Sequence, residues 1–251
     1  MNLRGHPAAA ALLGMALAFA PHARAAGDLT GVWSWPGADK TFRSNPDTAW
    51  SHEKLPFSAE GRAAVEANHP GKGPRLRHNP RERNDPLVLG NPPGLLRTLI
   101  YMSSFEFVQT QGRVLQMFSL GRVFRDIYMD GRSVPREVAE VPRWYGYSVG
   151  HWDGDTLVVQ TSALDSRAWM DDWGTPFTDD ARVEERWRRI APDKLQLQIT
   201  VTDPALYSKP WTSQPVVYSL RPKTQNLGED IHAPVDEQRF SEVITHPAGG
   251  Q

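Results

Sequence analysis

The chain has 251 residues, of which 39% are hydrophobic and 23% charged, and it contains no cysteine. This is ordinary globular composition, and the lack of cysteine excludes disulfide bonds, thiolate zinc sites and cysteine catalysis. The formal charge of −1 argues against nucleic acid or an anionic membrane as a partner, because both favour a strongly basic face.

Residues 1–25 have the pattern of a secretory signal peptide. A positive start is followed by an apolar run of 13 residues at 8–20 and by the small-x-small sequence Ala23-Arg24-Ala25. Such a run is too short to span a membrane, which takes about 20 residues. Removing residues 1–25 leaves 26 basic and 29 acidic side chains, a formal charge of −3. We therefore expect a secreted, periplasmic bacterial protein without membrane insertion, with residues 26–251 forming a single domain.

The first elements along the chain are a strand and a helix. Asp28–Trp35 is a predicted strand, and the Pro-rich residues 36–57 predict a covering loop. Ser58 is a good N-cap for a helix that ends at Asn68, before a proline and a glycine. Residues 70–94 are rich in proline and glycine and predict an irregular stretch over the domain surface.

From Leu96 onward the pattern favours β-strands. Aromatic and branched residues gather in short runs between turn residues, and apolar side chains alternate with Gln and Thr at 195–202, as in a half-buried strand. The predicted strands are Leu99–Gln109, Arg113–Leu120, Arg122–Met129, the hairpin Arg143–Thr161 around the turn Asp153–Asp155, Arg182–Ile190, Leu195–Thr202 and Val216–Leu220, with a last helix or strand at 236–244. About eight short strands and one helix predict an antiparallel barrel or sandwich.

Several motifs carry a family resemblance. Leu29-Thr30-Gly31-Val32-Trp33 resembles the G-x-W opening strand of lipocalin-like (calycin) barrels. Residues 127–132, 146–159, 185–187 and 203–211 resemble, in order, the motifs of an uncharacterised family of secreted bacterial proteins. The resemblance implies export and an all-β, antiparallel lipocalin-like barrel with one short helix in its N-terminal half and long covering loops. That family often has Pro-His-Ser where this chain has Pro176-Phe177-Thr178, so no role of that histidine carries over.

Gly146-x-Ser148-x-Gly150 fits the nucleophile-elbow pattern of α/β hydrolases. An elbow needs a strand before the serine and a helix after it, whereas a hairpin and another strand are predicted here. A serine hydrolase is therefore the least favoured of the functional alternatives. The other interpretation is that the two glycines relieve crowding where this strand packs.

Three charged residues fall among apolar neighbours on predicted strands: Glu106, Arg125 and Arg186. A buried charge without a partner is costly, so Glu106 and Arg125 are expected to meet each other or other polar groups. Two interpretations stay open. The charges form a buried pair that fixes the barrel, or they form a polar cluster at the bottom of a pocket, where Arg holds an anion and Glu106 moves a proton.

His151 and Asp165 complete the candidate catalytic set. His151 precedes the hairpin turn, and histidine ordinarily titrates near neutral pH, which suits a general acid or base; the alternative is a partly exposed strand histidine. Asp165 opens a Trp-rich loop that would make a reasonable mouth or lid. In this hypothesis Glu106, Asp165 or His151 moves the proton, and Arg125 or Arg186 stabilises negative charge.

Aromatic side chains with a polar tip are typical of pockets for rings, sugars and terpenoid-like ligands. The candidate ligand-binding residues are Tyr128, Trp152, Trp169, Trp173, Tyr207 and Trp211, with core and rim packing as the alternative. No metal is predicted, because the acidic turn at 153–155 has too few carboxylates for calcium and the histidines lack zinc spacing. No cofactor is predicted, because the glycine-rich pattern lies between strands.

Together these patterns predict a secreted β-barrel that binds a small apolar or aromatic molecule in an internal pocket. Two functions stay open. One is a cofactor-independent lyase, isomerase or hydratase, and the other is a non-catalytic periplasmic carrier. A small-molecule ligand is the expected partner, and the oligomeric state stays open.

Overall fold

A computed structural model describes residues 27–34, 55–68, 84–87, 89–101, 104–171 and 173–228. The predicted signal peptide and the element at 236–244 lie outside these residues, as do most of the loop 36–57 and most of the stretch 70–94. The described strands are β1 (Gly31–Ser34), β2 (Phe105–Thr110), β3 (Arg113–Phe118), β4 (Phe124–Tyr128), β5 (Tyr147–Asp153), β6 (Thr156–Ser162), β7 (Arg182–Ala191), β8 (Lys194–Thr202), β9 (Trp211–Thr212) and β10 (Val216–Leu220). The described helices are α2 (Ala59–Asn68), α3 (Gly94–Ile100) and α4 (Arg136–Ala139).

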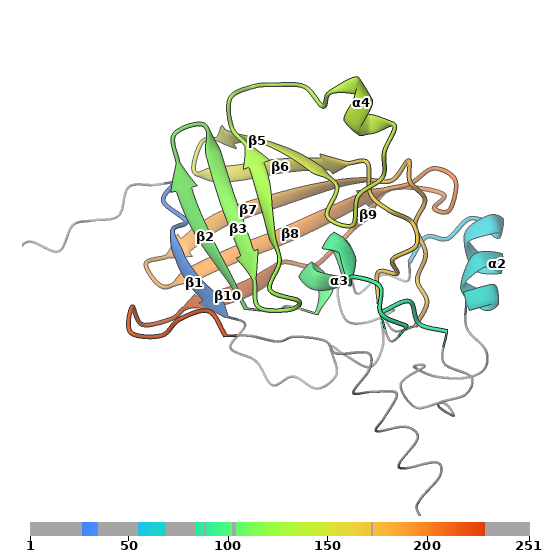
Figure 1. The fold of residues 1–251 in the computed structure, drawn as a ribbon, viewed down its shortest axis with the longest axis horizontal. Coiled ribbons are helices and arrows are strands. Elements are labelled where there is room, and N and C mark those ends of the chain that lie inside the picture. Colours follow the sequence, from blue (N-terminus) through green and yellow to red (C-terminus); the bar gives the residue numbers. More distant parts are fainter. Residues whose placement is uncertain are drawn as a thin grey trace, which may run out of the picture.

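Within the described residues, the strands close into a barrel (Figure 1). Sequence neighbours pair from β1 to β8, and β10 pairs with both β1 and β8. Trp33 lies opposite Leu220 on one side of β10, and Leu197 lies opposite Val216 on the other. The ring thus has nine strands, and the short β9 extends the sheet beyond β8. The predicted all-β barrel is confirmed.

One pair departs from the antiparallel pattern. β4 and β5 run parallel, with Ile127 opposite Ser148 and Tyr128 opposite Val149, whereas the other pairings are antiparallel. Parallel neighbours need a crossover rather than a tight turn. Here the crossover is the segment that carries α4, the helix at the top of Figure 1.

Aromatic side chains fill the barrel interior. Trp33, Phe105, Phe107, Trp187 and Tyr218 are at most 1% exposed. The ring of Phe105 lies 5.0 Å from that of Tyr218, and the ring of Phe107 lies 5.2 Å from that of Trp187, both near perpendicular. The predicted alternation on β8 is confirmed, because its four inward apolar side chains are fully buried. Around these side chains the interior is a packed core.

Helix α2 is the one that the sequence predicts. The hydroxyl of Ser58 accepts a hydrogen bond from the backbone N–H of Gly61 at 3.0 Å, which is the expected N-cap. None of the described helices is long and apolar enough to span a bilayer.

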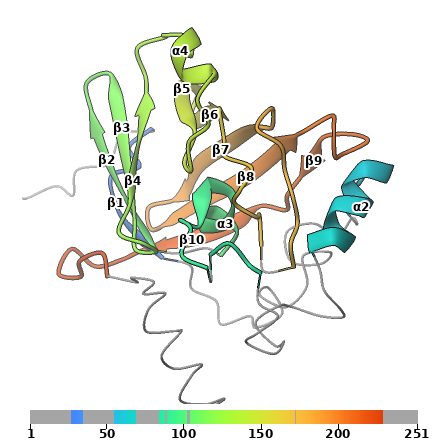
Figure 2. The ribbon, with the colours of Figure 1, turned by 45° about the vertical axis from the view of Figure 1, so that its right-hand side comes forward.

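Helix α3 corrects the predicted strand Leu99–Gln109, because the helix runs to Ile100 and β2 begins only at Phe105. Leu95, Leu96 and Leu99 are 1% exposed and belong to the barrel core, with a spacing that suits one face of a helix. Figure 2 shows α3 at the opening of the barrel, while α2 lies apart from it. The helix therefore closes one end of the core.

Gly146 and Gly150 have the steric role proposed for the G-x-S-x-G pattern. Gly146 has a φ of +62°, and an added Cβ would lie 2.5 Å from Cγ2 of Thr161 and 2.6 Å from the carbonyl oxygen of Ser162. At Gly150 an added Cβ would lie 2.9 Å from Cγ2 of Ile127. The crowding comes from neighbouring strands.

We expect Gly146→Ala to lower the free energy of unfolding by about 2–4 kcal/mol, since it combines a left-handed backbone with a steric clash. Urea denaturation of the purified protein measures this loss. The matched control is Gly112→Ala, because Gly112 also has a positive φ, +80°, but an added Cβ there meets nothing within 4 Å. Equal losses in the two variants would contradict the crowding at Gly146.

Candidate functional site

The predicted buried charge Arg125 meets Glu185 in the barrel core. Nη1 of Arg125 donates to Oε1 of Glu185 at 2.8 Å, and Nη2 donates to Oε2 at 2.5 Å. The two side chains are 3% and 0% exposed. Glu106 and Arg125 were expected to meet each other or other polar groups, and the partner of Arg125 is Glu185 rather than Glu106. Glu185 comes from β7, on the other side of the parallel seam.

The remaining donors of Arg125 are also used. Nε and Nη2 donate to Oε1 of Gln116, and Nη1 donates to Oγ of Ser148 at 3.3 Å. All five N–H groups of the guanidinium therefore have an acceptor, which leaves none for a substrate oxyanion. The geometry favours the first of the two interpretations, a buried ion pair that fixes the barrel.

An open cavity of about 840 Å³ lies elsewhere, on the outer side of the barrel wall. Val32, Glu106, Met117 and Phe124 are successive partners across β1, β2, β3 and β4, so they form one row on this wall. Their strand neighbours point into the core instead, because side chains alternate along a strand. The cavity is therefore built from outward-facing side chains, and Glu106 is the predicted catalytic residue that lines it.

The segment that follows β10 forms the second wall of this cavity. The backbone N–H of Arg221 donates to the carbonyl of Val32 at 2.8 Å, and Nη2 of Arg221 donates to Oγ of Ser104 at 3.2 Å. Farther along, Arg122 donates from Nη1 to the carbonyl of Leu227 at 3.5 Å. Residues 220–227 are thus attached to the barrel at both ends of the stretch that lines the cavity.

The cavity has an apolar wall and a charged rim. The apolar side chains include Val32, Met117 and Val123, and the charged ones are Glu106, Arg122, Arg221 and Lys223. Gln225 and Asn226 add amide groups. Three cations against one carboxylate make the rim net positive, in a protein that is slightly acidic as a whole.

The other predicted catalytic residues lie away from this cavity. His151 is exposed on β5, and Arg186 forms a surface ion pair, with Nη2 donating to Oδ2 of Asp153 at 2.8 Å. Asp165 is bound by Arg167, whose guanidinium lowers the pKa of Asp165 and keeps it ionised. These side chains and Arg125 are not among the described residues that line the cavity with Glu106.

The six predicted ligand-binding aromatics likewise serve packing or lie apart from the described lining of the cavity. Trp169, Tyr207 and Trp211 are at most 8% exposed. Tyr207 donates to the carbonyl of Pro176 at 2.9 Å, and burial raises its pKa well above the usual value. Trp173 is half-buried.

Two of the six aromatics contact their neighbours near the surface. The ring of Tyr128 lies 5.0 Å from that of Tyr147, and Trp152 covers Gly27. The alternative of core and rim packing therefore describes most of this set.

Ser148 does not have the geometry of a hydrolase nucleophile. It lies within β5, is 2% exposed, and its hydroxyl lies 2.8 Å from that of Thr161. A nucleophile elbow instead places the serine on a sharp turn between a strand and a helix. The chain continues from Ser148 to a hairpin whose register pairs Asp153 with Thr156, which confirms the predicted turn.

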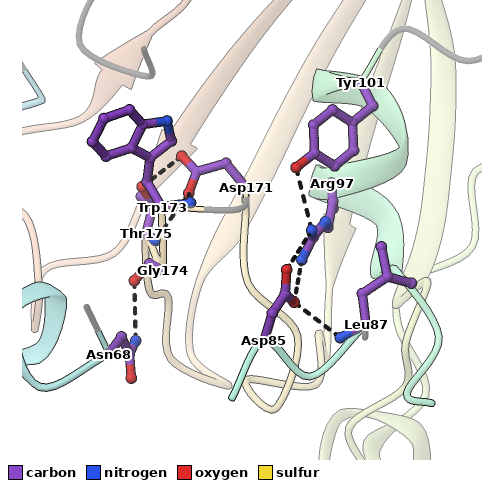
Figure 3. A network of polar contacts seen from close by, with 9 residues as sticks. All are labelled: Asn68, Asp85, Leu87, Arg97, Tyr101, Asp171, Trp173, Gly174 and Thr175. Atoms are coloured by element: carbon purple, nitrogen blue, oxygen red, sulfur yellow. Dashed lines mark hydrogen bonds and ion pairs between the residues drawn. The ribbon is translucent and has the colours of Figure 1, made fainter. Parts of the chain in front are cut away.

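Sequence reasoning missed a buried polar network beside α3 (Figure 3). Arg97 of this helix donates to both carboxylate oxygens of Asp85, at 2.6 and 2.7 Å, and the two side chains are 3% and 1% exposed. Nη2 of Arg97 also donates to the hydroxyl of Tyr101 at 3.2 Å. Asp85 lies in the Pro-rich stretch, where no periodicity identifies a buried acid.

Asp171 forms the second half of this network. Its carboxylate accepts hydrogen bonds from the hydroxyl of Thr175 at 2.6 Å, from the backbone N–H of Thr175 at 3.1 Å and from that of Trp173 at 2.9 Å (Figure 3). Burial nevertheless raises the pKa of Asp171, and these hydrogen bonds and the charge of Arg97 only partly oppose it. Figure 3 also shows Asn68, at the end of α2, bonded to the carbonyl of Gly174.

Comparison of the chain with models of known protein families, with curated proteins and with solved structures found no match. Among the described residues, no group of three His, Asp or Glu side chains is placed to hold a metal ion. The functional argument therefore depends on the geometry of the cavity.

We expect Arg125→Met and Glu185→Gln each to lower the free energy of unfolding by about 3–5 kcal/mol, because each leaves a buried charge without its partner. The double variant should be more stable than the sum of the two losses predicts. Urea denaturation of all three variants measures this coupling. The control is Arg186→Met, which breaks an exposed pair and should cost less than about 1 kcal/mol. Additive losses at Arg125 and Glu185 would contradict the coupling.

We expect Asp171 to make the protein less stable as pH rises above 3.8, its ordinary pKa. Ionising this carboxylate costs more in the folded state, so stability is greatest when the group is protonated and falls up to its raised folded pKa. Asp171→Asn cannot ionise, and its stability relative to the wild type should therefore increase across this window. Denaturation at several pH values between 4 and 7 measures the difference.

The control for this experiment is Asp130→Asn. Arg132 lowers the pKa of Asp130 to about 2, so the stabilising effect of that carboxylate is complete above pH 3.8 and is lost only as pH falls toward 2. The difference in the free energy of unfolding between Asp130→Asn and the wild type should therefore stay constant from pH 4 to 7. A constant difference for Asp171→Asn as well would contradict the raised pKa of Asp171.

Proposed function

We propose that the protein binds a small, largely apolar molecule in the cavity between the outer wall of β1–β4 and residues 220–227. The observation that carries this proposal is the cavity itself. Its volume of about 840 Å³ falls within the range of ligand pockets, roughly 300–1,000 Å³. It combines an apolar wall with a few polar groups at the rim, as such pockets do.

Binding without turnover is the function that the geometry supports best. Of the five predicted catalytic residues, Glu106 alone is among the described residues that line the cavity, while Arg125 has no free donor. A carrier needs only shape, apolar surface and orienting polar groups. Export through residues 1–25 belongs to the same proposal and would place the carrier in the periplasm.

A lyase, isomerase or hydratase is the second candidate, and one observation favours it. The cavity holds a carboxylate, Glu106, together with the cations Arg221 and Lys223. A carboxylate can move a proton while a nearby cation stabilises negative charge on the substrate. In this candidate Arg221 takes the role that the sequence assigned to Arg125 or Arg186.

Nile red, a neutral dye that fluoresces in apolar surroundings, tests the proposal. We expect saturable binding to the protein that Met117→Trp weakens more than about tenfold, because the larger side chain projects into the cavity from its apolar wall and displaces the dye there. The control is Leu115→Trp, which lies on the same outer face of β3 but is not among the lining residues. No saturable binding, or equal effects of the two variants, would refute the cavity as the binding site.

The dye then reports on natural ligand classes. Phenolics, steroids, terpenoids and sugars are screened for displacement of Nile red, and each compound that displaces it is recovered and analysed by mass spectrometry and NMR, because an isomerase would leave the mass unchanged. An unchanged chemical structure supports the carrier. A change of structure or mass that Glu106→Gln abolishes supports the enzyme.

A further inference from the structure

The charges of the cavity rim are unevenly placed. Arg221 and Lys223 lie on the segment after β10, and Glu106 lies on the opposite wall. Arg122 already donates to the carbonyl of Leu227. The two cations of the segment set the charge that a ligand meets on that side, and Arg122 adds a third positive charge that its bond to a neutral carbonyl does not remove.

Arg221 is held in a fixed position beside the cavity. Its backbone N–H is bonded to Val32, and Nη2 of its half-buried side chain donates to Ser104. A guanidinium has five N–H donors and can bind a carboxylate through two of them. Lys223, by contrast, is exposed and lies two residues farther along the same wall. Arg221 therefore offers a donor group in a fixed orientation, and Lys223 offers a positive charge on a side chain that can adjust to the ligand.

The apolar wall strengthens the effect of these cations. Charges beside a low-dielectric surface attract an anion more strongly than the same charges in open solvent. Val32, Met117 and Val123 provide that surface within the same cavity. A ligand that contacts both the apolar wall and the cations of the rim has an apolar body and a negative group at one end.

We infer that the ligand is an amphipathic carboxylate, with its apolar body on the outer wall of β1–β4 and its carboxylate bound by Arg221 and Lys223. This inference rests on the proposed function, because it names the ligand class of the same cavity. Glu106 opposes the anion electrostatically and restricts the carboxylate to the side of the cations. A hydroxyl group on the body of the ligand could donate to Glu106.

Two probes of the same shape test the charge. 2-Naphthoate carries a carboxylate, and 2-naphthamide is its neutral counterpart. Both are titrated against protein-bound Nile red, and we expect 2-naphthoate to bind about five- to tenfold more tightly, as one or two partly exposed ion pairs would give. Higher salt should reduce the affinity of 2-naphthoate alone.

Three variants locate the effect. Lys223→Gln should weaken the binding of 2-naphthoate about two- to fivefold, and Glu106→Gln should strengthen it by a similar factor, while the affinity for the uncharged 2-naphthamide should change less in each variant. Lys209→Gln is the control, because it removes the same charge from an exposed position that is not among the lining residues. The opposite signs of the two cavity variants separate an electrostatic role from a general loss of folding.

The outcomes distinguish the two proposals. If Nile red does not bind, the proposed function fails. If Nile red binds but 2-naphthoate does not displace it, or binds no better than 2-naphthamide, the cavity stands and the assignment of an anionic ligand is overturned. An equal effect of Lys209→Gln and Lys223→Gln would also overturn the assignment to the rim.

Discussion

The buried ion pair between Arg125 and Glu185 is the constraint on which the barrel interior depends. The seam between β4 and β5 is parallel and has two residue pairs in register. Parallel pairing is slightly weaker per residue than antiparallel pairing. Arg125 bridges this seam, since it bonds Ser148 of β5 and Glu185 of β7 as well as Gln116 of β3. Its five donors are satisfied only when these strands are in register.

The ion pair and the aromatic core together exclude a ligand from the part of the interior that they occupy. Trp187 donates from Nε1 to Glu185 at 3.0 Å, so the charged and aromatic parts of the core are one packed unit. A charge in this position can be stabilised only by its fixed partners, and opening a space beside it would expose it to an empty cavity. The same alternation that directs Arg125 inward directs Phe124 outward, where the cavity lies.

The sequence predicts the strands better than the site, because strands depend on local patterns whereas the site depends on residues far apart in the sequence. Alternation at 195–202 and the Asp153–Asp155 turn are local, and the structure has both. Pairing of charges depends on which strands become neighbours, and no local pattern connects Arg125 with β7. Helix α3 was missed because Leu99 can belong to a helical face or to a strand when the run is short.

The cavity was unpredictable for a related reason. Its wall contains Glu106, which the sequence identified, but its cations Arg221 and Lys223 follow the last described strand in an irregular segment. Such residues have no periodicity, and their position depends on where β10 ends. The aromatic residues were predicted to bind a ligand but are not among the described residues that line the cavity, because a Trp or Tyr suits a packed core as well as a pocket.

Closure of the barrel and construction of the cavity are therefore the same structural event. Leu220 pairs with Trp33 where β10 meets β1, and the next backbone N–H, that of Arg221, donates to Val32. Leu220 also donates to the carbonyl of Asp193, in the turn between β7 and β8. The second wall of the cavity begins where β10 is joined to both edges of the sheet. The inward side chains of β1–β4 then contribute to the stability of the fold, while their outward side chains face the ligand in the proposed cavity.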